Sequence, residues 1–194
     1  SSAASDVYKR QLDAVLADIQ RNGGVDEYWV LGDLVAVGAQ PVQVLERVSA
    51  LPNVRFTRGN TDEYITSGLR PAPPPQAVEA DLGKLPVFDE VALTMAWTQG
   101  AVSAAGWMDF LDSLPLEQHL TLPDGKRLLG VHASPGENNS RGIRPDYDKA
   151  EVNQRFGHCN ADLICVGHTH WPLATDVGHR RVVNLGSVGN PRVP

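Results

Sequence analysis

Short apolar runs alternate with helical periodicity along the first third of this chain. The runs at residues 28–31 and 54–57 are too brief for helices, and between them a helical pattern begins at Pro41 and continues through Val44, Leu45 and Val48. A short run that is apolar throughout is typical of a parallel strand buried on both faces. Strand and helix in alternation predict βαβ units and therefore an α/β fold.

The rest of the chain fits the same class. A helix is expected from Leu12 to the Asn22-Gly23-Gly24 stop, with further helices near residues 107–111 and 148–156. Hairpins are predicted around Asp124-Gly125 and at Gly178, and a buried strand at 163–166. Residues 71–100 begin with a proline-rich run and show no clear period, which predicts an irregular insertion or cap.

Composition limits the class of protein. A chain of 194 residues with 42% hydrophobic residues can form one domain with its own core. The net charge is −6 and lysine and arginine form no block, so no nucleic-acid-binding patch is expected. Two unpatterned cysteines predict a reducing, cytoplasmic location, and no apolar stretch predicts a membrane span or secretory signal.

Polar residues of metal-binding type follow four of the expected strands. They are Asp33, the 59–62 segment Gly-Asn-Thr-Asp, His132, and the pair His168 and His170. Each alone is weak evidence, because such residues often cap helices or form turns. Open α/β sheets bind ligands at the carboxyl ends of their strands, so together these residues predict one crevice.

The residue types indicate the chemistry. A carboxylate such as Asp33 can bridge two divalent ions, and imidazoles with an amide oxygen suit manganese, iron or zinc better than calcium. Two ions about 3.5–4 Å apart can hold a hydroxide for in-line attack on phosphorus. Glycine before the ligands would let the backbone approach metal and phosphate closely.

The motifs GDLVAVG at 32–38, GNTD at 59–62, His132 and GHTH at 167–170 resemble those of calcineurin-like metallophosphoesterases, and NLGSVGNPR at 184–192 resembles a stretch of the smaller bacterial members. The resemblance implies a four-layer α/β sandwich with two mixed β-sheets flanked by helices. It also implies a dinuclear centre of Mn, Fe, Zn, Ni or Mg ions that hydrolyses a small phosphomonoester or phosphodiester.

The same resemblance assigns roles to residues. Asp33 would bridge the ions, Asn60, His132 and His168 would bind one of them, and His170 would bind the other. Asn60 and Asp62 would be catalytic, and Thr61 with Asn60 would contact the substrate. Thr61 stands where a better-known branch has a histidine, which leaves the general acid open.

The N-terminus departs from the family pattern. Relatives begin with a strand that carries a D-x-H motif for the first metal, whereas this chain has SSAASDVYKRQ. The hexapeptide at 6–11 resembles the translation of a sequencing-library adapter. We therefore expect residues 1–11 to be non-native, and residues 12–194 to be a metallophosphoesterase domain that is truncated at its N-terminus and also at its C-terminus.

Two other functions are compatible with an α/β domain. A non-catalytic metal-binding or regulatory module would use the same cluster without turnover. A nucleotide-binding domain without metal would need a glycine-rich phosphate loop, and the sequence contains neither of the two usual patterns. His119, His158 and His179 are expected at the surface, and Asn138, Asn139 and Arg141 in a solvated loop.

Overall fold

The computed structural model describes residues 7–35 and 38–192. Its helices are α2 (Val7–Arg21), α3 (Pro41–Ser49), α4 (Asn60–Ser67), α5 (Pro75–Ala80), the 3₁₀ helix η1 (Leu82–Lys84), α6 (Leu85–Ala104), α7 (Met108–Asp112) and α8 (Lys149–Phe156). Its strands are β1 (Tyr28–Val30), β2 (Val54–Phe56), β3 (Glu117–Thr121), β4 (Arg127–Val131), β5 (Leu163–Val166), β6 (Leu173–Val177) and β7 (Arg180–Asn184). Strand and helix alternate through the first part of the chain, as predicted.

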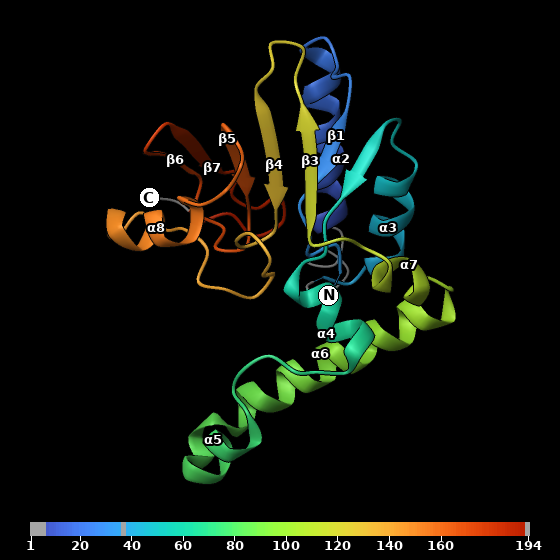
Figure 1. Ribbon diagram of the computed structural model, residues 1–194. Helices are drawn as coiled ribbons and strands as arrows, with labels where there is room; N and C mark the ends of the chain where they lie inside the picture. Colours follow the sequence, from blue (N-terminus) through green and yellow to red (C-terminus); the bar gives the residue numbers. More distant parts are fainter. Residues whose placement is uncertain (1–6, 36–37, 193–194) are drawn as a thin grey trace.

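The strands form two sheets (Figure 1). In the first, β1 and β2 are parallel, with Tyr28 opposite Val54. The second has the order β3-β4-β5-β7-β6. Its central pairs β4–β5 and β5–β7 are parallel, and both predicted hairpins, β3–β4 and β6–β7, are antiparallel. The second sheet is therefore mixed, whereas the described strands of the first are all parallel.

Each sheet has its own hydrophobic core and its own helices. On the side of β1 and β2, Leu45 and Val48 of α3 are buried in one apolar cluster, and on the other side Phe156 of α8 packs with the strands around Ile164. The sheets meet where Trp29 lies over Gly130, since a Cβ at Gly130 would come within 2.5 Å of the indole. This arrangement confirms the predicted fold of two sheets flanked by helices.

Residues 71–100 differ from the prediction of an irregular insertion. Most of them are helical, in α5, η1 and the long helix α6. Helix α6 was not predicted because apolar residues occur on all of its sides. Its sequence therefore lacks the 3.6-residue period that indicates an amphipathic helix. In the described parts of the chain, no helix is long and apolar enough to cross a membrane.

The N-terminal prediction lies partly outside the described residues, because positions 1–6 are among those not described. Helix α2 begins at Val7, so the backbone is helical through the last residues of the segment expected to be non-native. The helix ends at Arg21, directly before the predicted stop at Asn22-Gly23-Gly24. The origin of residues 1–11 stays a prediction.

Candidate metal centre

The five predicted metal ligands lie at the carboxyl ends of four strands. Asp33 follows β1, Asn60 opens α4 after β2, and His132 directly follows β4. His168 and His170 lie in the loop between β5 and β6. Because β4 and β5 are parallel neighbours, their carboxyl ends bring the histidine segments to the same edge of the sheet.

Three donor atoms converge at this edge. The His132 Nε2 atom lies 3.0 Å from Asn60 Oδ1 and 3.2 Å from His168 Nδ1, and His168 Nδ1 lies 2.9 Å from Asn60 Oδ1. Atoms bound to one ion at about 2.1 Å in a tetrahedral arrangement would be separated by about 3.4 Å. The triangle formed by Asn60, His132 and His168 therefore fits one divalent cation with little rearrangement.

Asp33 lies beside this triangle. Its Oδ2 atom is 3.4 Å from His132 Nε2, while Oδ1 accepts a hydrogen bond of 3.0 Å from the backbone N–H of Thr61. The Thr61 hydroxyl also lies 2.9 Å from Asp33 Oδ1. One carboxylate oxygen of Asp33 is thus held by Thr61 and the other faces the imidazole cluster.

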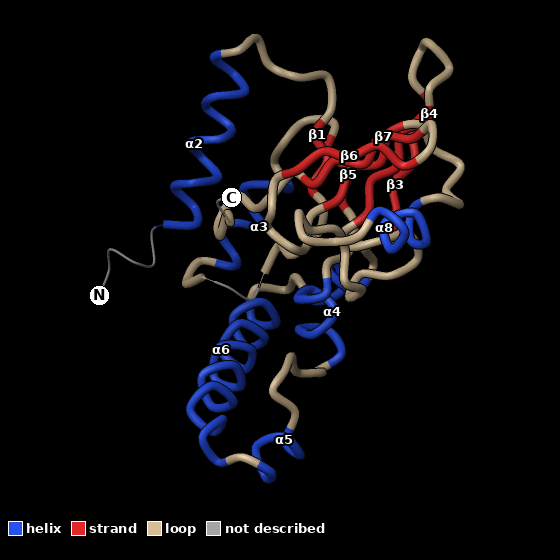
Figure 2. Tube along the Cα trace, turned by 90° about the vertical axis from the view of Figure 1, so that its left-hand side faces the viewer, coloured by secondary structure: helices blue, strands red, loops and turns tan. Residues whose placement is uncertain are grey.

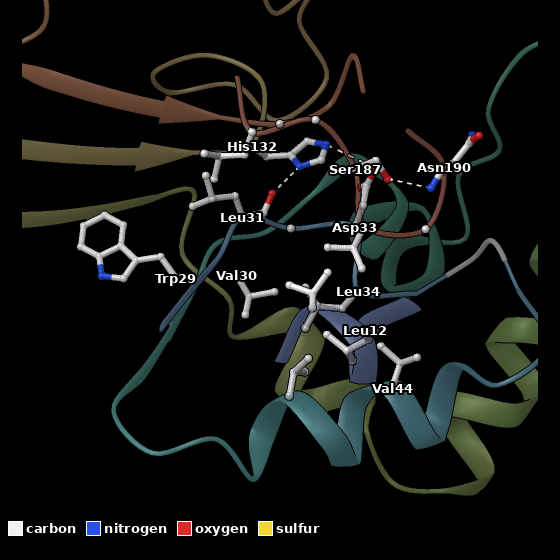
Figure 3. A pocket seen from close by; sticks show the side chains of 18 of the residues that line it. Leu12, Trp29, Val30, Leu31, Asp33, Leu34, Val44, His132, Ser187 and Asn190 are labelled. Carbon is white, nitrogen blue, oxygen red and sulfur yellow. Dashed lines mark hydrogen bonds and ion pairs between the residues drawn. The ribbon is translucent and has the colours of Figure 1, made fainter. Parts of the chain in front are cut away.

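The His132 ring is oriented by the backbone. Its Nδ1 atom lies 2.6 Å from the Leu31 carbonyl oxygen and donates to it (Figure 3). This leaves the Nε2 lone pair directed at Asn60 and His168. A carbonyl that fixes the tautomer in this way is the usual support for a metal-binding histidine. His132 is 3% exposed, so its ring has little freedom to turn away.

Asp33 and His132 shift each other's pKa. Burial alone would raise the pKa of Asp33, but the hydrogen bond and charge of His132 and the hydrogen bonds from Thr61 hold that pKa below its usual value. Burial alone would lower the pKa of His132, but Asp33 outweighs it and raises that pKa. The buried Asp33 carboxylate therefore favours a positive partner, and a metal ion could take the place of the His132 proton.

The other two histidines favour the neutral form that binds metals. Burial, followed by the charge of His132, lowers the pKa of His168 to about 4. Burial is also the main reason that the pKa of His170 is lowered, although Asp33 opposes it. Both rings are therefore available as ligands at neutral pH without first losing a proton.

Asp62 has a different environment from the one expected of a catalytic group. The residue is fully buried, and its carboxylate accepts hydrogen bonds from three backbone N–H groups, those of Gly59, Asp33 and Leu34, at 2.8–2.9 Å. Burial, followed by the charge of Asp33, raises the pKa of Asp62 to about 7. This geometry ties two ligand loops together and argues against direct contact between Asp62 and a phosphoryl group.

Glycine is required where the two loops touch. A Cβ at Gly32 would lie 2.5 Å from the Gly59 nitrogen and 2.7 Å from His132 Nδ1, and a Cβ at Gly59 would lie 2.1 Å from the Asp33 nitrogen. Gly32 also has a φ of +80°. The expected close approach of backbone at the ligands is therefore present at these two glycines.

Two supporting residues were not identified from the sequence. Asn184, buried at the end of β7, donates to the Gly167 carbonyl oxygen and to Thr169 Oγ1, both at 2.8 Å. Asn138 is also buried, and donates to Glu63 Oε2 at 2.6 Å and to the Gly59 carbonyl oxygen at 3.3 Å, so its assignment to a solvated loop was wrong. The sequence signals for Asn184 were its place at the end of an apolar strand and at the start of the NLGSVGNPR stretch, and neither indicated this supporting role.

The centre lies at one end of a mostly apolar cavity of about 360 Å³ (Figure 3). Asp33, His132, His168 and His170 all line this cavity. Most of the remaining lining comes from α2, from β1 and the segment after it, from α3, and from residues 185–190. In the described part of the chain, the His170 ring has no hydrogen bond to the other four predicted ligands, so it borders the cluster without joining it.

The donor set depends on an amide. Within residues 7–35 and 38–192, no three Asp, Glu, His or Cys side chains form a group placed to hold an ion by themselves. The converging set consists of two imidazole nitrogens and the Asn60 oxygen, with Asp33 alongside. Such a mixed nitrogen and oxygen set fits a transition-metal or zinc ion better than calcium.

Comparison with known proteins supports this interpretation. The family model of the calcineurin-like phosphoesterase superfamily domain matches residues 2–194. The uncharacterized protein MJ0912 of Methanocaldococcus jannaschii is 31% identical over 93% of this chain and 72% of its own length. A symmetrical bis(5'-nucleosyl)-tetraphosphatase of Erwinia tasmaniensis is 30% identical over 72% of this chain and 42% of its own length.

Solved structures agree with the fold. A metallophosphoesterase from Sphaerobacter thermophilus superposes with a TM-score of 0.63 at 27% identity, over 97% of this chain and 74% of the other. The hypothetical protein PH1004 from Pyrococcus horikoshii gives a TM-score of 0.74 at 21% identity, over 96% and 73% of the two chains. Because the family model matches almost the whole length of this chain, the chain belongs to the calcineurin-like phosphoesterase superfamily.

Proposed function

We propose that this protein hydrolyses phosphate esters at a divalent metal centre held by Asp33, Asn60, His132, His168 and His170. The observation that carries this proposal is the convergence of Asn60, His132 and His168 within 3.2 Å of one another, beside the buried carboxylate of Asp33. Members of the family generally use divalent metals. Ions bound here would polarise the phosphoryl group, neutralise its developing charge and make a bound water a stronger nucleophile.

The chain's own residues divide the remaining work. Asp33 is the shared carboxylate, since one of its oxygens faces the imidazoles and the other is anchored by Thr61. Asn60 holds its amide oxygen toward the histidines, and its free amide hydrogens could contact a substrate oxygen. Thr61 and Asp62 act by positioning, because their polar groups are already used within the ligand loops.

A second ion would need more ligands than Asp33 and His170. We propose that they come from an apolar strand with the D-x-H motif, and that this strand occupies the cavity beside β1. Tyr28, Trp29 and Val30 line that cavity, and in the described residues β1 pairs only with β2, so its other backbone edge is open to another strand. Asp33 and His170 border the same cavity, where an added strand could complete their site.

The substrate class is a small phosphorylated molecule. Phosphomonoesters and phosphodiesters are both compatible with a centre that holds the reacting phosphoryl group through metal ions. The relative from Erwinia tasmaniensis is named as a symmetrical bis(5'-nucleosyl)-tetraphosphatase, which makes dinucleoside polyphosphates worth including as test substrates.

The test is hydrolysis by purified protein with p-nitrophenyl phosphate, bis(p-nitrophenyl) phosphate and diadenosine tetraphosphate, each with Mn²⁺, Zn²⁺, Ni²⁺ or Mg²⁺. The protein would be assayed with its unaltered sequence and with an apolar D-x-H strand fused before Leu12. We expect metal-dependent turnover that is abolished in Asn60→Ala, and higher turnover with the fused strand. Turnover that is indifferent to both metal and Asn60 would refute the proposed centre.

A non-catalytic metal-binding module is the alternative. The small number of ligands for a second ion favours this alternative for the protein without the fused strand. Such a module would bind one ion per chain by elemental analysis and hydrolyse none of the three esters, even with the fused strand. A second bound equivalent together with turnover in the fused protein would exclude it.

A further inference from the structure

The hairpin of α5 and α6 extends away from the two sheets (Figures 1 and 2). It carries exposed apolar residues. On α6, Leu93 is 71% exposed and Trp97, one helical turn later, is 52% exposed. Leu85, at the start of the helix, is also exposed. Large apolar side chains grouped on one exposed helix face commonly mark a protein interface.

The opposite face of α6 already has its partners. Met95, Thr98 and Val102 are buried there, and the Gln99 amide donates to the Ile65 carbonyl oxygen of α4 at 2.8 Å. The helix therefore contacts the domain through one face and leaves the face with Leu93 and Trp97 uncovered. A helix that is apolar on all sides is normally buried on all sides, so this second face lacks a partner.

Gly100 provides a separate reason to expect close contact. It lies within α6 on the exposed side, and a Cβ built on it would have no atom within 4 Å. Alanine would fit there and would be favoured by about 1 kcal/mol in a helix interior. Within residues 7–35 and 38–192, no neighbouring atom requires glycine at this position, whereas the backbone of an approaching helix would.

From this face we propose that the protein forms a two-fold dimer in which α6 packs antiparallel against α6 of a second copy. The exposed face alternates large and small residues, with Ala96, Gly100 and Ala104 beside Leu93 and Trp97. An antiparallel pair centred between positions 96 and 97 sets Leu93 on Gly100 of the partner subunit, and Trp97 on Ala96 of the partner subunit. A surface that fits a copy of itself in this way is the requirement for an isologous interface.

The charges on α6 favour the same orientation. Asp89 and Glu90 lie at the N-terminal end of the exposed stretch, and the C-terminal half from Met95 to Ala104 carries no charged side chain. A parallel pair would set each acidic residue against its own copy. In the antiparallel pair Asp89 faces Ala104 of the partner subunit, and the two copies of Asp89 are roughly 22 Å apart at about 1.5 Å of rise per residue.

The test is the molar mass of the full chain by light scattering and sedimentation velocity, from about 1 to 100 µM. We expect a dimer at the upper concentrations, and at least a tenfold weaker dissociation constant in Leu93→Glu and in Trp97→Glu. Val25→Glu is the matched control, because Val25 is 50% exposed but lies between α2 and β1, away from the hairpin. This control should dimerise like the unaltered protein.

Gly100→Leu separates specific packing from general stickiness. The substitution adds apolar surface, so a merely sticky face would associate more strongly, whereas helices in close contact at Gly100 would associate more weakly. The proposal is overturned if the protein is a monomer at 100 µM, or if it is a monomer that instead binds lipid vesicles. It is also overturned if the two glutamate variants keep the mass of the unaltered protein, or if Gly100→Leu associates more tightly. Ester hydrolysis is also measured in the monomeric variants. This measurement distinguishes a failure of the proposed dimer from a failure of the proposed metal centre.

Discussion

Asn184→Leu should destabilise the fold and weaken metal binding, although Asn184 touches no predicted ligand side chain. The Asn184 amide joins the end of β7 to the loop that carries His168 and His170, through the Gly167 carbonyl oxygen and Thr169 Oγ1. Leucine has a similar size and shape but can form neither bond. The substitution therefore removes hydrogen bonds without leaving a large cavity.

The magnitude follows from the hydrogen bonds that are lost. The Gly167 carbonyl oxygen would lose the bond of 2.8 Å from Asn184 but keep the one of 2.7 Å from the Thr169 N–H, and the Gly186 N–H would lose the Asn184 side-chain oxygen at 2.9 Å. Each lost hydrogen bond costs about 0.5–1.5 kcal/mol net, and the substitution removes the bonds of Asn184 to Gly167, Thr169 and Gly186. We expect a loss of about 2–4 kcal/mol in the free energy of unfolding, which lowers the melting temperature by roughly 5–15 °C.

The assay combines urea unfolding of the metal-free protein with a Co²⁺ titration followed by visible absorption. Because loss of a support beside a ligand typically costs about 10–100-fold in metal affinity, Asn184→Leu should weaken Co²⁺ binding by a factor in that range. Asn22→Leu is the control, since the Asn22 amide makes a single exposed bond to the Asp18 carbonyl oxygen. If Asn184→Leu unfolds at the urea concentration of this control and binds Co²⁺ normally, the supporting role of Asn184 is wrong.

Three further outcomes are expected. Asp33→Ala should reduce metal-dependent ester hydrolysis by orders of magnitude, while His179→Ala should be nearly silent; equal losses would contradict the assigned roles. Gly32→Ala should lower stability by more than about 2 kcal/mol in thermal unfolding, because its Cβ would lie 2.5 Å from the Gly59 nitrogen. Burial lowers the pKa of His168 to about 4, below its unfolded value of 6.5. Between these pH values the unfolded chain binds a proton that the folded chain does not, so this residue lowers the stability of the fold as pH falls from about 6.5 to 4. His168→Gln should lose less stability than the unaltered metal-free protein across that window, and parallel pH profiles in urea unfolding would contradict this.

The strands and the ligand positions could be predicted because they depend on local sequence. A short apolar run followed by glycine and a polar residue indicates both a buried strand and the side chain at its end, which is how Asp33 and His168 were found. His132 was found because it directly follows such a run. Helix α6 could not be found in this way, because its pattern has no single apolar face. Its exposed face also stays unexplained within one chain, so the failed prediction and the proposed dimer have the same physical origin.

The roles of supporting residues depend on contacts between distant parts of the chain. Asp62 follows Asn60 and Thr61 in a polar motif, which favoured a catalytic role, yet its carboxylate is turned inward to the amides of Asp33 and Leu34. Asn184 is separated from Gly167 by two strands and a turn. Sequence identifies polar residues, but only the fold decides whether they face a ligand or a neighbouring loop.

Hydrogen bonds within the protein fix the backbone of the ligand loops. Asp33, His168 and His170 have φ values of 55°, 63° and 65°, a left-handed conformation that side chains other than glycine rarely adopt. Such strain persists only where the surroundings fix the backbone, as Asp62 does for the first loop and Asn184 for the second. Because these hydrogen bonds involve no metal, the donor atoms should stay close together in the metal-free protein, and metal removal should lower affinity for substrate without unfolding the domain.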